Sequence, residues 1–199
     1  MTKQVYVDGS VFNNGRSHAT GGYGVCFVNS NAEGTQLVQV IGGRLPAPCT
    51  NNIAELTGAV VAMKAALQMG RHDVKLFTDS QYVVNGFTDW MQGWERRGWR
   101  TREGAEVKNQ NYWQALLELR KVVKARFIWV RGHSGDYWNE LADSVAGVCN
   151  SENYHINLSV NDSNRDQVTR EVEAIINNKT NKQLAINFVE RCGMEAAHV

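Results

Sequence analysis

The chain has 199 residues, which is enough for one well-filled domain with a modest appendage but not for two full-sized domains. Hydrophobic residues make up 43% and charged residues 21% of it, which is typical of a folded globular protein and too apolar for a disordered one. The formal net charge is +1, from 21 basic and 20 acidic residues, and this average alone argues against a nucleic-acid-binding protein.

The cysteines and the amino terminus bear on the cellular compartment. The four cysteines lie far apart, without a CxxC pair or a zinc-type spacing, so reduced thiols are expected. The first residues run into a strand-like segment with no signal peptide, and no apolar run approaches the ~20 residues that span a bilayer. These features predict a cytoplasmic protein that is not associated with a membrane.

The first part of the chain predicts three strands followed by a helix. Residues 5–12, 22–28 and 36–41 have strand character, and the short turns between them favour an antiparallel meander. From Asn52 to Leu67 the apolar residues recur at helical spacing, and the helix ends at Met69-Gly70.

Strands and helices alternate further along the chain. The predicted elements are a strand over 74–77, a helix over 79–87, a helix over 109–124, a strand over 127–130, a loop over 131–138 and a helix over 139–148. The whole order predicts an α/β fold: a five-stranded mixed sheet, with three antiparallel strands and then two parallel ones, flanked by helices on both faces.

The composition shifts after residue 149, which we take as the end of the first domain. Residues 150–164 are rich in Asn and Ser and are predicted to be a linker. Residues 165–199 contain two amphipathic stretches and are predicted to form a helical C-terminal extension. The role of this extension stays open between packing on the first domain, dimerisation and docking to a partner protein.

Four acidic residues stand where acids are costly unless they are used. Asp8 interrupts an apolar strand, Glu55 lies one turn into the first helix, Asp79 ends a strand, and Asp143 lies on the last predicted helix. Each has an ordinary alternative explanation: a turn aspartate, a capping-box glutamate, a helix N-cap and a solvated surface charge, respectively.

The joint placement of the four acids points to a shared role. In a mixed sheet with the first strand at its centre, the ends of the first and fourth strands lie side by side, which places Asp8 near Asp79. Glu55 and Asp143 can reach the same place from their helices. Crowded carboxylates repel one another unless cations neutralise them, and hard oxygen ligands suit a pair of Mg²⁺ ions, with Mn²⁺ as a substitute, for phosphoryl transfer.

Six short motifs along the chain indicate a resemblance to a known family. They are VDGS (7–10), GGYG (21–24), TNNIAEL (50–56), TDSQYV (78–83), WERRGW (94–99) and VRGHSGDYWNELAD (130–143). In this order over residues 1–149 they resemble type 1 ribonuclease H, of the bacterial or phage kind with a basic protrusion. The resemblance implies a ribonuclease H-like fold and catalytic domain over 1–149. It also implies endonucleolytic hydrolysis of the RNA strand of RNA–DNA hybrids by two-metal-ion catalysis, leaving 5′-phosphate and 3′-hydroxyl ends.

The resemblance also assigns roles to individual residues. Asp8, Glu55, Asp79 and Asp143 match the metal-binding carboxylates, with Asp8 bridging both ions, and His133 matches a mobile catalytic histidine. The positions that match hybrid-binding residues are Asn14, Thr50, Asn51, Asn52, Gln81, Arg96, Arg97, Arg100 and Asn139.

The charge distribution agrees with this resemblance once it is taken by segment. Residues 90–131 carry 10 basic and 4 acidic side chains, whereas the acids predominate after residue 131, so the average conceals a basic segment of the chain. The expected partner is an RNA–DNA hybrid, and the expected state is a monomer. A non-catalytic hybrid-binding module is one alternative, but it would be expected to lack one of the carboxylates. The remaining alternatives are another nuclease on the same fold and a fragment of a reverse transcriptase.

Overall fold

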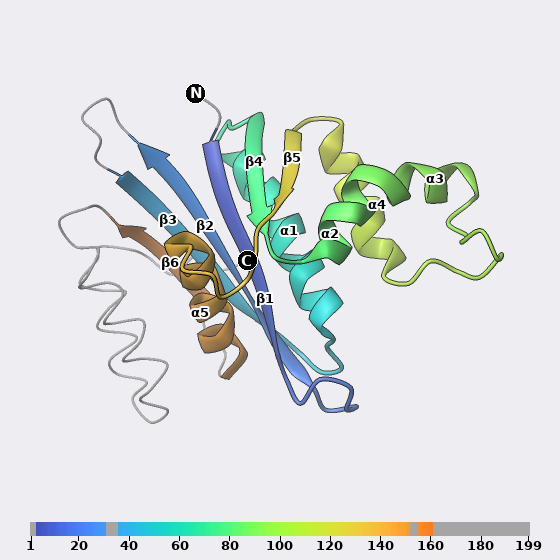
Figure 1. Ribbon diagram of the computed structural model, residues 1–199, viewed down its shortest axis with the longest axis horizontal. Helices are drawn as coiled ribbons and strands as arrows, with labels where there is room; N and C mark the ends of the chain where they lie inside the picture. The colour runs from blue at the N-terminus through green and yellow to red at the C-terminus, as the bar shows by residue number, and fades with distance from the viewer. Residues whose placement is uncertain (1–2, 31–35, 152–154, 161–199) are drawn as a thin grey trace.

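The computed structural model describes residues 3–30, 36–151 and 155–160 (Figure 1). A six-stranded mixed sheet forms its centre, in the order β5-β4-β1-β2-β3-β6. Pairing is antiparallel along β1-β2-β3-β6 and parallel along β1-β4-β5. The strands are β1 (Lys3–Phe12), β2 (Thr20–Ser30), β3 (Gln36–Leu45), β4 (Asp73–Thr78), β5 (Lys124–Trp129) and β6 (His155–Val160). The predicted fold class is therefore confirmed, with a sixth strand added.

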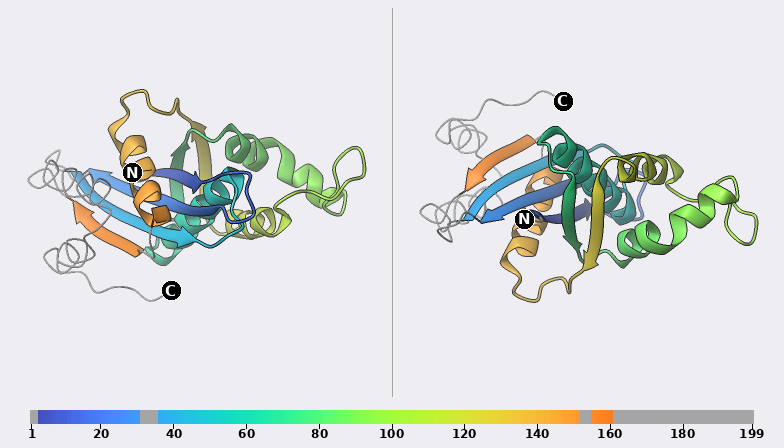
Figure 2. Two further views of the ribbon diagram at one scale, coloured as in Figure 1. Left: turned by 90° about the horizontal axis from the view of Figure 1, so that it is seen from below. Right: turned by 90° about the horizontal axis from the view of Figure 1, so that it is seen from above.

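Helices cover both faces of the sheet (Figure 2). α1 (Asn51–Gln68) and α4 (Gln110–Arg120) lie on one face, and α5 (Tyr137–Ser151) lies on the other. A continuous helical stretch made of α2 (Gln81–Asn85), the π-helical η1 (Gly86–Trp90) and α3 (Met91–Arg96) extends beyond the β5 edge. The predicted helix over 79–87 is thus longer than expected and begins two residues later.

The alternation of side chains along β1 explains why the sheet needs cover on both faces. Val5 and Val7 are buried in the core cluster under α1, whereas Tyr6 is buried in the cluster under α5. Because successive side chains of a strand point to opposite faces, Asp8 shares the face of Tyr6. The buried part of this central strand consists of Val5, Tyr6, Val7 and Asp8, so one carboxylate lies among apolar residues in the interior of the fold.

The structure corrects part of the predicted linker over 150–164. α5 continues to Ser151, and residues 155–160 form β6, which pairs antiparallel with β3 so that Leu158 lies opposite Val40. The Asn and Ser content that indicated a linker did not prevent a strand, because an edge strand is held by backbone hydrogen bonds to its neighbour. The predicted extension over 165–199 lies outside the described residues. Among the helices that the structure describes, none is both long and apolar enough to cross a membrane.

Candidate active site

The two strand acids meet as expected where β1 and β4 run parallel. Asp8 lies inside β1 opposite Gly24 of β2, is 5% exposed, and accepts a hydrogen bond from the Gly9 N–H at 2.7 Å. Asp79 directly follows β4, whose Phe77 is opposite Tyr6 of β1. Asp8 is therefore a strand residue and not a turn aspartate. Asp79 is not the helix cap either, because the Ser80 side chain caps α2 at the Val83 N–H.

Glu55 is brought to the same place by the start of α1. The N-cap of α1 is Thr50, whose hydroxyl accepts from the Ile53 N–H at 3.3 Å, so Glu55 lies too far along the helix for a capping box. Gly9 allows the close approach of this helix to β1, since an added Cβ there would overlap the backbone nitrogen of Glu55. Carboxylate oxygens of Asp8, Glu55 and Asp79 lie within 4.8 Å of one another.

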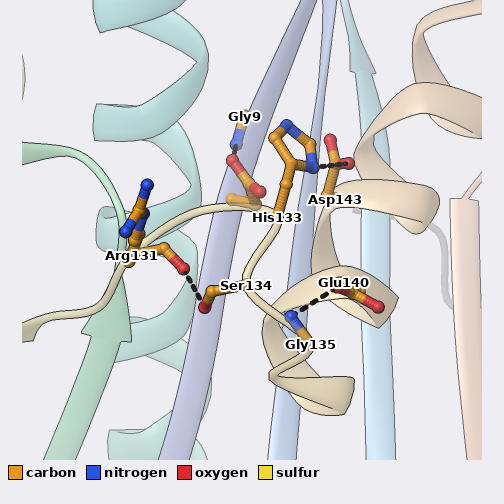
Figure 3. Close-up of polar contacts among 8 residues, drawn as sticks. Gly9, Arg131, His133, Ser134, Gly135, Glu140 and Asp143 are labelled. Carbon is orange, nitrogen blue, oxygen red and sulfur yellow. Dashed lines mark hydrogen bonds and ion pairs between the residues drawn. The ribbon is translucent and has the colours of Figure 1, made fainter.

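The side chains of Asp143 and His133 point toward each other (Figure 3). Asp143, on α5, has a 40% exposed side chain, and its Oδ2 is 3.8 Å from Nδ1 of His133, which is 81% exposed. The charge of Asp143 acts on both Asp8 and Glu55, so it is part of the cluster's electrostatics and not an isolated surface charge.

The loop that carries His133 has one hydrogen bond within it and one to α5. The Ser134 hydroxyl donates to the Arg131 carbonyl at 2.6 Å, and the Gly135 N–H donates to Oε1 of Glu140 at 3.0 Å (Figure 3). His133 itself adopts a left-handed backbone with φ of 50°. Glu140 was not among the predicted site residues, although it lies within the motif over 130–143 that carries part of the family resemblance.

Burial and mutual repulsion perturb the acids strongly. Burial, together with the charges of Asp79 and Asp143, raises the pKa of Asp8 to about 8. Burial and the other three acids hold the pKa of Glu55 well above its usual range. Burial is also the main cause of the raised pKa of Asp143, which the nearby His133 opposes. Such a site favours cations, because they remove the repulsion that protons otherwise relieve.

The donor set fits a divalent metal ion. All ligand atoms offered by Asp8, Glu55 and Asp79 are carboxylate oxygens, which are the donors that Mg²⁺ and Mn²⁺ prefer. Oε2 of Glu55 is buried and has no hydrogen-bond partner among the described residues. A buried carboxylate oxygen without a partner is costly, and a bound cation would remove that cost.

We expect the stability of the metal-free protein to fall as the pH rises from about 4 to 8. The pKa of Asp8 is raised from an ordinary 3.8 to about 8, so the folded state keeps a proton that the unfolded chain has released. Divalent cations should stabilise the protein more at pH 8 than at pH 5, because they bind the deprotonated acids. Thermal unfolding with chelator and with Mn²⁺ at several pH values measures both trends. Chelated protein that grows more stable from pH 5 to 8 would contradict the site's electrostatics.

Most of the predicted substrate-binding residues are exposed around the acids. Asn14 lies in the β1–β2 turn, and Thr50, Asn51 and Asn52 begin α1. The Cys49 N–H donates to the Ala19 carbonyl at 2.8 Å, which holds the start of α1 near that turn. Gln81 is the exposed first residue of α2, next to Asp79.

Asn139 is the exception among the predicted substrate contacts. It lies in the first turn of α5, is 2% exposed, and donates its backbone N–H to Oδ1 of Asp136 at 3.4 Å. This burial sets Asn139 apart from the other predicted substrate contacts, and a direct contact of its side chain with substrate stays a prediction.

The basic lobe, residues 90–108, is held on the domain by aromatic packing. The ring centroid of Trp94 lies 5.5 Å from that of the buried Trp113 of α4. The Tyr82 hydroxyl accepts a hydrogen bond from Nε1 of Trp113 at 3.3 Å. Arg97 and Arg100 each donate a side-chain hydrogen bond to a backbone carbonyl within the lobe, at 3.1 and 2.9 Å. Arg96 is exposed on α3.

Comparison with known proteins establishes the family. The sequence model of the RNase H family matches residues 2–150. The chain is 40% identical over 147 residues to ribonuclease H of Hahella chejuensis, covering 74% of this chain and 92% of that protein. It is 38% identical over 141 residues to ribonuclease HI of Xylella fastidiosa strain 9a5c, covering 71% and 87%. The chain belongs to the RNase H family and is an endoribonuclease of that class.

A solved structure agrees with this assignment. The crystal structure of LC9-RNase H1, a type 1 RNase H with the type 2 active-site motif, superposes with a TM-score of 0.73 at 29% identity. The alignment covers 88% of this chain and 84% of that chain. Family membership supports cleavage of the RNA strand in RNA–DNA hybrids.

Proposed function

We propose that this enzyme hydrolyses the RNA strand of RNA–DNA hybrids by two-metal-ion catalysis and leaves 5′-phosphate and 3′-hydroxyl ends. The observation that carries the proposal is the partly buried carboxylate cluster of Asp8, Glu55 and Asp79, in which Oε2 of Glu55 has no partner within the described structure. A group of acids with this much repulsion suits Mg²⁺, and Mn²⁺ would substitute for it.

The residues of the site have separate tasks in this proposal. Asp8, Glu55, Asp79 and Asp143 would hold the ions, which when bound supply a nucleophile at neutral pH and offset charge that builds up on the phosphate. His133 lies on the exposed side of Asp143, where its imidazole can take up and pass on a proton at Nδ1. The hydrogen bond from the Gly135 N–H to Glu140 ties the histidine loop to the helix that carries Asp143.

Substrate selection is assigned to the exposed amides around the acids and to the basic lobe. Asn14, Asn51, Asn52 and Gln81 carry short amide side chains that can both donate to and accept from 2′-hydroxyl groups. The Thr50 hydroxyl oxygen accepts a hydrogen bond when it caps α1, so its O–H group can still donate to substrate. Arg96, Arg97 and Arg100 would contact phosphates, an interaction that adds affinity without reading sequence.

The direct test compares substrates in the presence of Mg²⁺. An RNA–DNA hybrid, duplex RNA, duplex DNA and single-stranded RNA are incubated separately with the enzyme and with the Asp79→Asn variant. We expect cleavage of the RNA strand of the hybrid alone, and no appreciable cleavage by the variant. Cleavage of duplex RNA or DNA as fast as the hybrid would favour another nuclease on this fold. A wild-type protein that binds the hybrid without cutting it would favour a non-catalytic module.

Arg96→Ala should weaken hybrid binding without slowing the chemical step. The exposed guanidinium is placed to contact a phosphate, so its loss should raise KM a few-fold, leave kcat unchanged, and reduce the salt slope of binding by about 1. Lys124→Ala is the matched control, because Lys124 begins β5 at the end away from the acids and pairs with Asp73 at 3.4 Å. Equal effects of the two substitutions on KM would contradict a specific role for Arg96.

A further inference from the structure

The hydroxyl of Thr78 connects the end of β4 with the acids. Thr78 is the last residue of β4 and is 1% exposed. Its Oγ1 accepts a hydrogen bond from the Ser80 N–H at 3.2 Å, and its side chain is also hydrogen-bonded to the Glu55 carboxylate. Since an ionised carboxylate only accepts, the Thr78 hydroxyl is the donor to Glu55.

The backbone of Thr78 is fixed as well. Its carbonyl accepts from the Val130 N–H at 3.0 Å, and the Asp79 carbonyl that follows accepts from Nε1 of Trp129 at 3.0 Å. The end of β5 therefore holds the end of β4 on one side, and the Thr78 hydroxyl reaches Glu55 on the other. One buried hydroxyl bridges the segment that carries Asp79 to the helix that carries Glu55.

We propose that Thr78 is a positioning residue that orients the Glu55 carboxylate for metal binding. Thr78 hydrogen-bonds the Glu55 carboxylate, whose Oε2 is buried and has no hydrogen-bond partner among the described residues. Glu55 also offers a carboxylate oxygen to the group within 4.8 Å of one another. Groups that hydrogen-bond metal ligands fix their orientation, and their loss lowers metal affinity or activity about 10–100-fold. The inference rests on the metal site of the proposed function and adds a residue that holds one ligand in place.

The test compares Thr78→Ser and Thr78→Ala, which differ by one hydroxyl. Mn²⁺ binding is measured by calorimetry on the full chain without nucleic acid, and kcat and KM are then measured with the hybrid. We expect Thr78→Ala to lose about 10–100-fold in Mn²⁺ affinity and to lower kcat with little change in KM, whereas Thr78→Ser keeps both near wild type. Thr57→Val is the matched control on the helix of Glu55, because the Thr57 hydroxyl donates to the Ile53 carbonyl at 2.7 Å.

The outcomes separate this inference from the proposed function. A Thr78→Ala protein that binds Mn²⁺ as tightly as wild type, or a Thr78→Ser protein as impaired as Thr78→Ala, would overturn the positioning role and leave the metal site standing. Wild-type protein that binds no Mn²⁺ would overturn both. Thermal unfolding of the chelated proteins shows whether each variant folds. If Thr78→Ala does not fold, Thr78→Val takes its place, because it replaces the hydroxyl by a methyl group of similar size. The same Mn²⁺ affinity, kcat and KM are then measured and compared with those of wild type and Thr78→Ser.

Discussion

Asp8→Asn is expected to lower hybrid cleavage by about a thousand-fold and, in the presence of chelator, to make the protein more stable. Asparagine keeps an oxygen that can accept from the Gly9 N–H but removes the charge at the centre of the cluster. A loss of ~4 kcal/mol in transition-state stabilisation gives the expected rate effect. The gain in stability follows from the pKa of Asp8, which burial and the neighbouring acids raise to about 8.

Asp73→Asn is the matched control for this substitution. Asp73 begins β4, at the end of the strand away from the cluster, and pairs with Lys124 and Arg126 at 3.4 and 3.2 Å. The same chemical change there should leave the rate unchanged and lower stability only slightly, because exposed ion pairs contribute little to stability. An Asp8→Asn enzyme with more than about a tenth of wild-type activity would contradict the metal-ligand role of Asp8.

Gly24→Ala should be the most damaging single-methyl change in the core. Gly24 lies opposite Asp8, and an added Cβ would overlap the carbonyl oxygen of Ala142 and lie 3.0 Å from the backbone nitrogen of Ala146. The methyl group must push α5 away from the sheet, at a cost of about 1–3 kcal/mol. Asp143 moves with α5, so cleavage should also slow. Thermal unfolding and steady-state kinetics with the hybrid measure the two effects.

Gly147→Ala, on α5, should raise stability, in contrast to Gly24→Ala on β2. An added Cβ at Gly147 has no neighbour within 4 Å among the described residues, and alanine favours a helix over glycine by about 1 kcal/mol. This variant should be more stable than wild type and equally active. If Gly24→Ala were as stable as Gly147→Ala, the close packing of α5 on β2 would not be what places Asp143.

The sequence predicts the fold and the acids well for a definite physical reason. An aspartate in the middle of the apolar β1, and another just after β4, conflict with strand burial unless the two are used together. Parallel pairing of β1 and β4 then requires them to be close. The local alternatives for Glu55 and Asp79 could only be decided in three dimensions, where Thr50 and Ser80 turn out to be the caps.

Other features depend on contacts that no local pattern carries. β6 is held by pairing with β3, and its Asn and Ser content indicates a linker when the segment is considered alone. Asn139 matches a substrate-binding position, but its place in the first turn of α5 buries it. The close approaches at Gly9 and Gly24 require the distances between elements. The average charge of +1 likewise conceals that residues 90–131 are basic and that acids predominate after residue 131.

If the carboxylate cluster is a metal-dependent centre for cutting RNA in a hybrid, cleavage must depend on added metal ions. Titrating Mg²⁺ into chelated enzyme, with each strand of the hybrid labelled separately, tests it most directly. We predict that no strand is cut in chelator, that RNA cleavage rises with Mg²⁺, and that the DNA strand stays intact. Cleavage that persists in chelator, or that occurs equally on the DNA strand, would contradict the account.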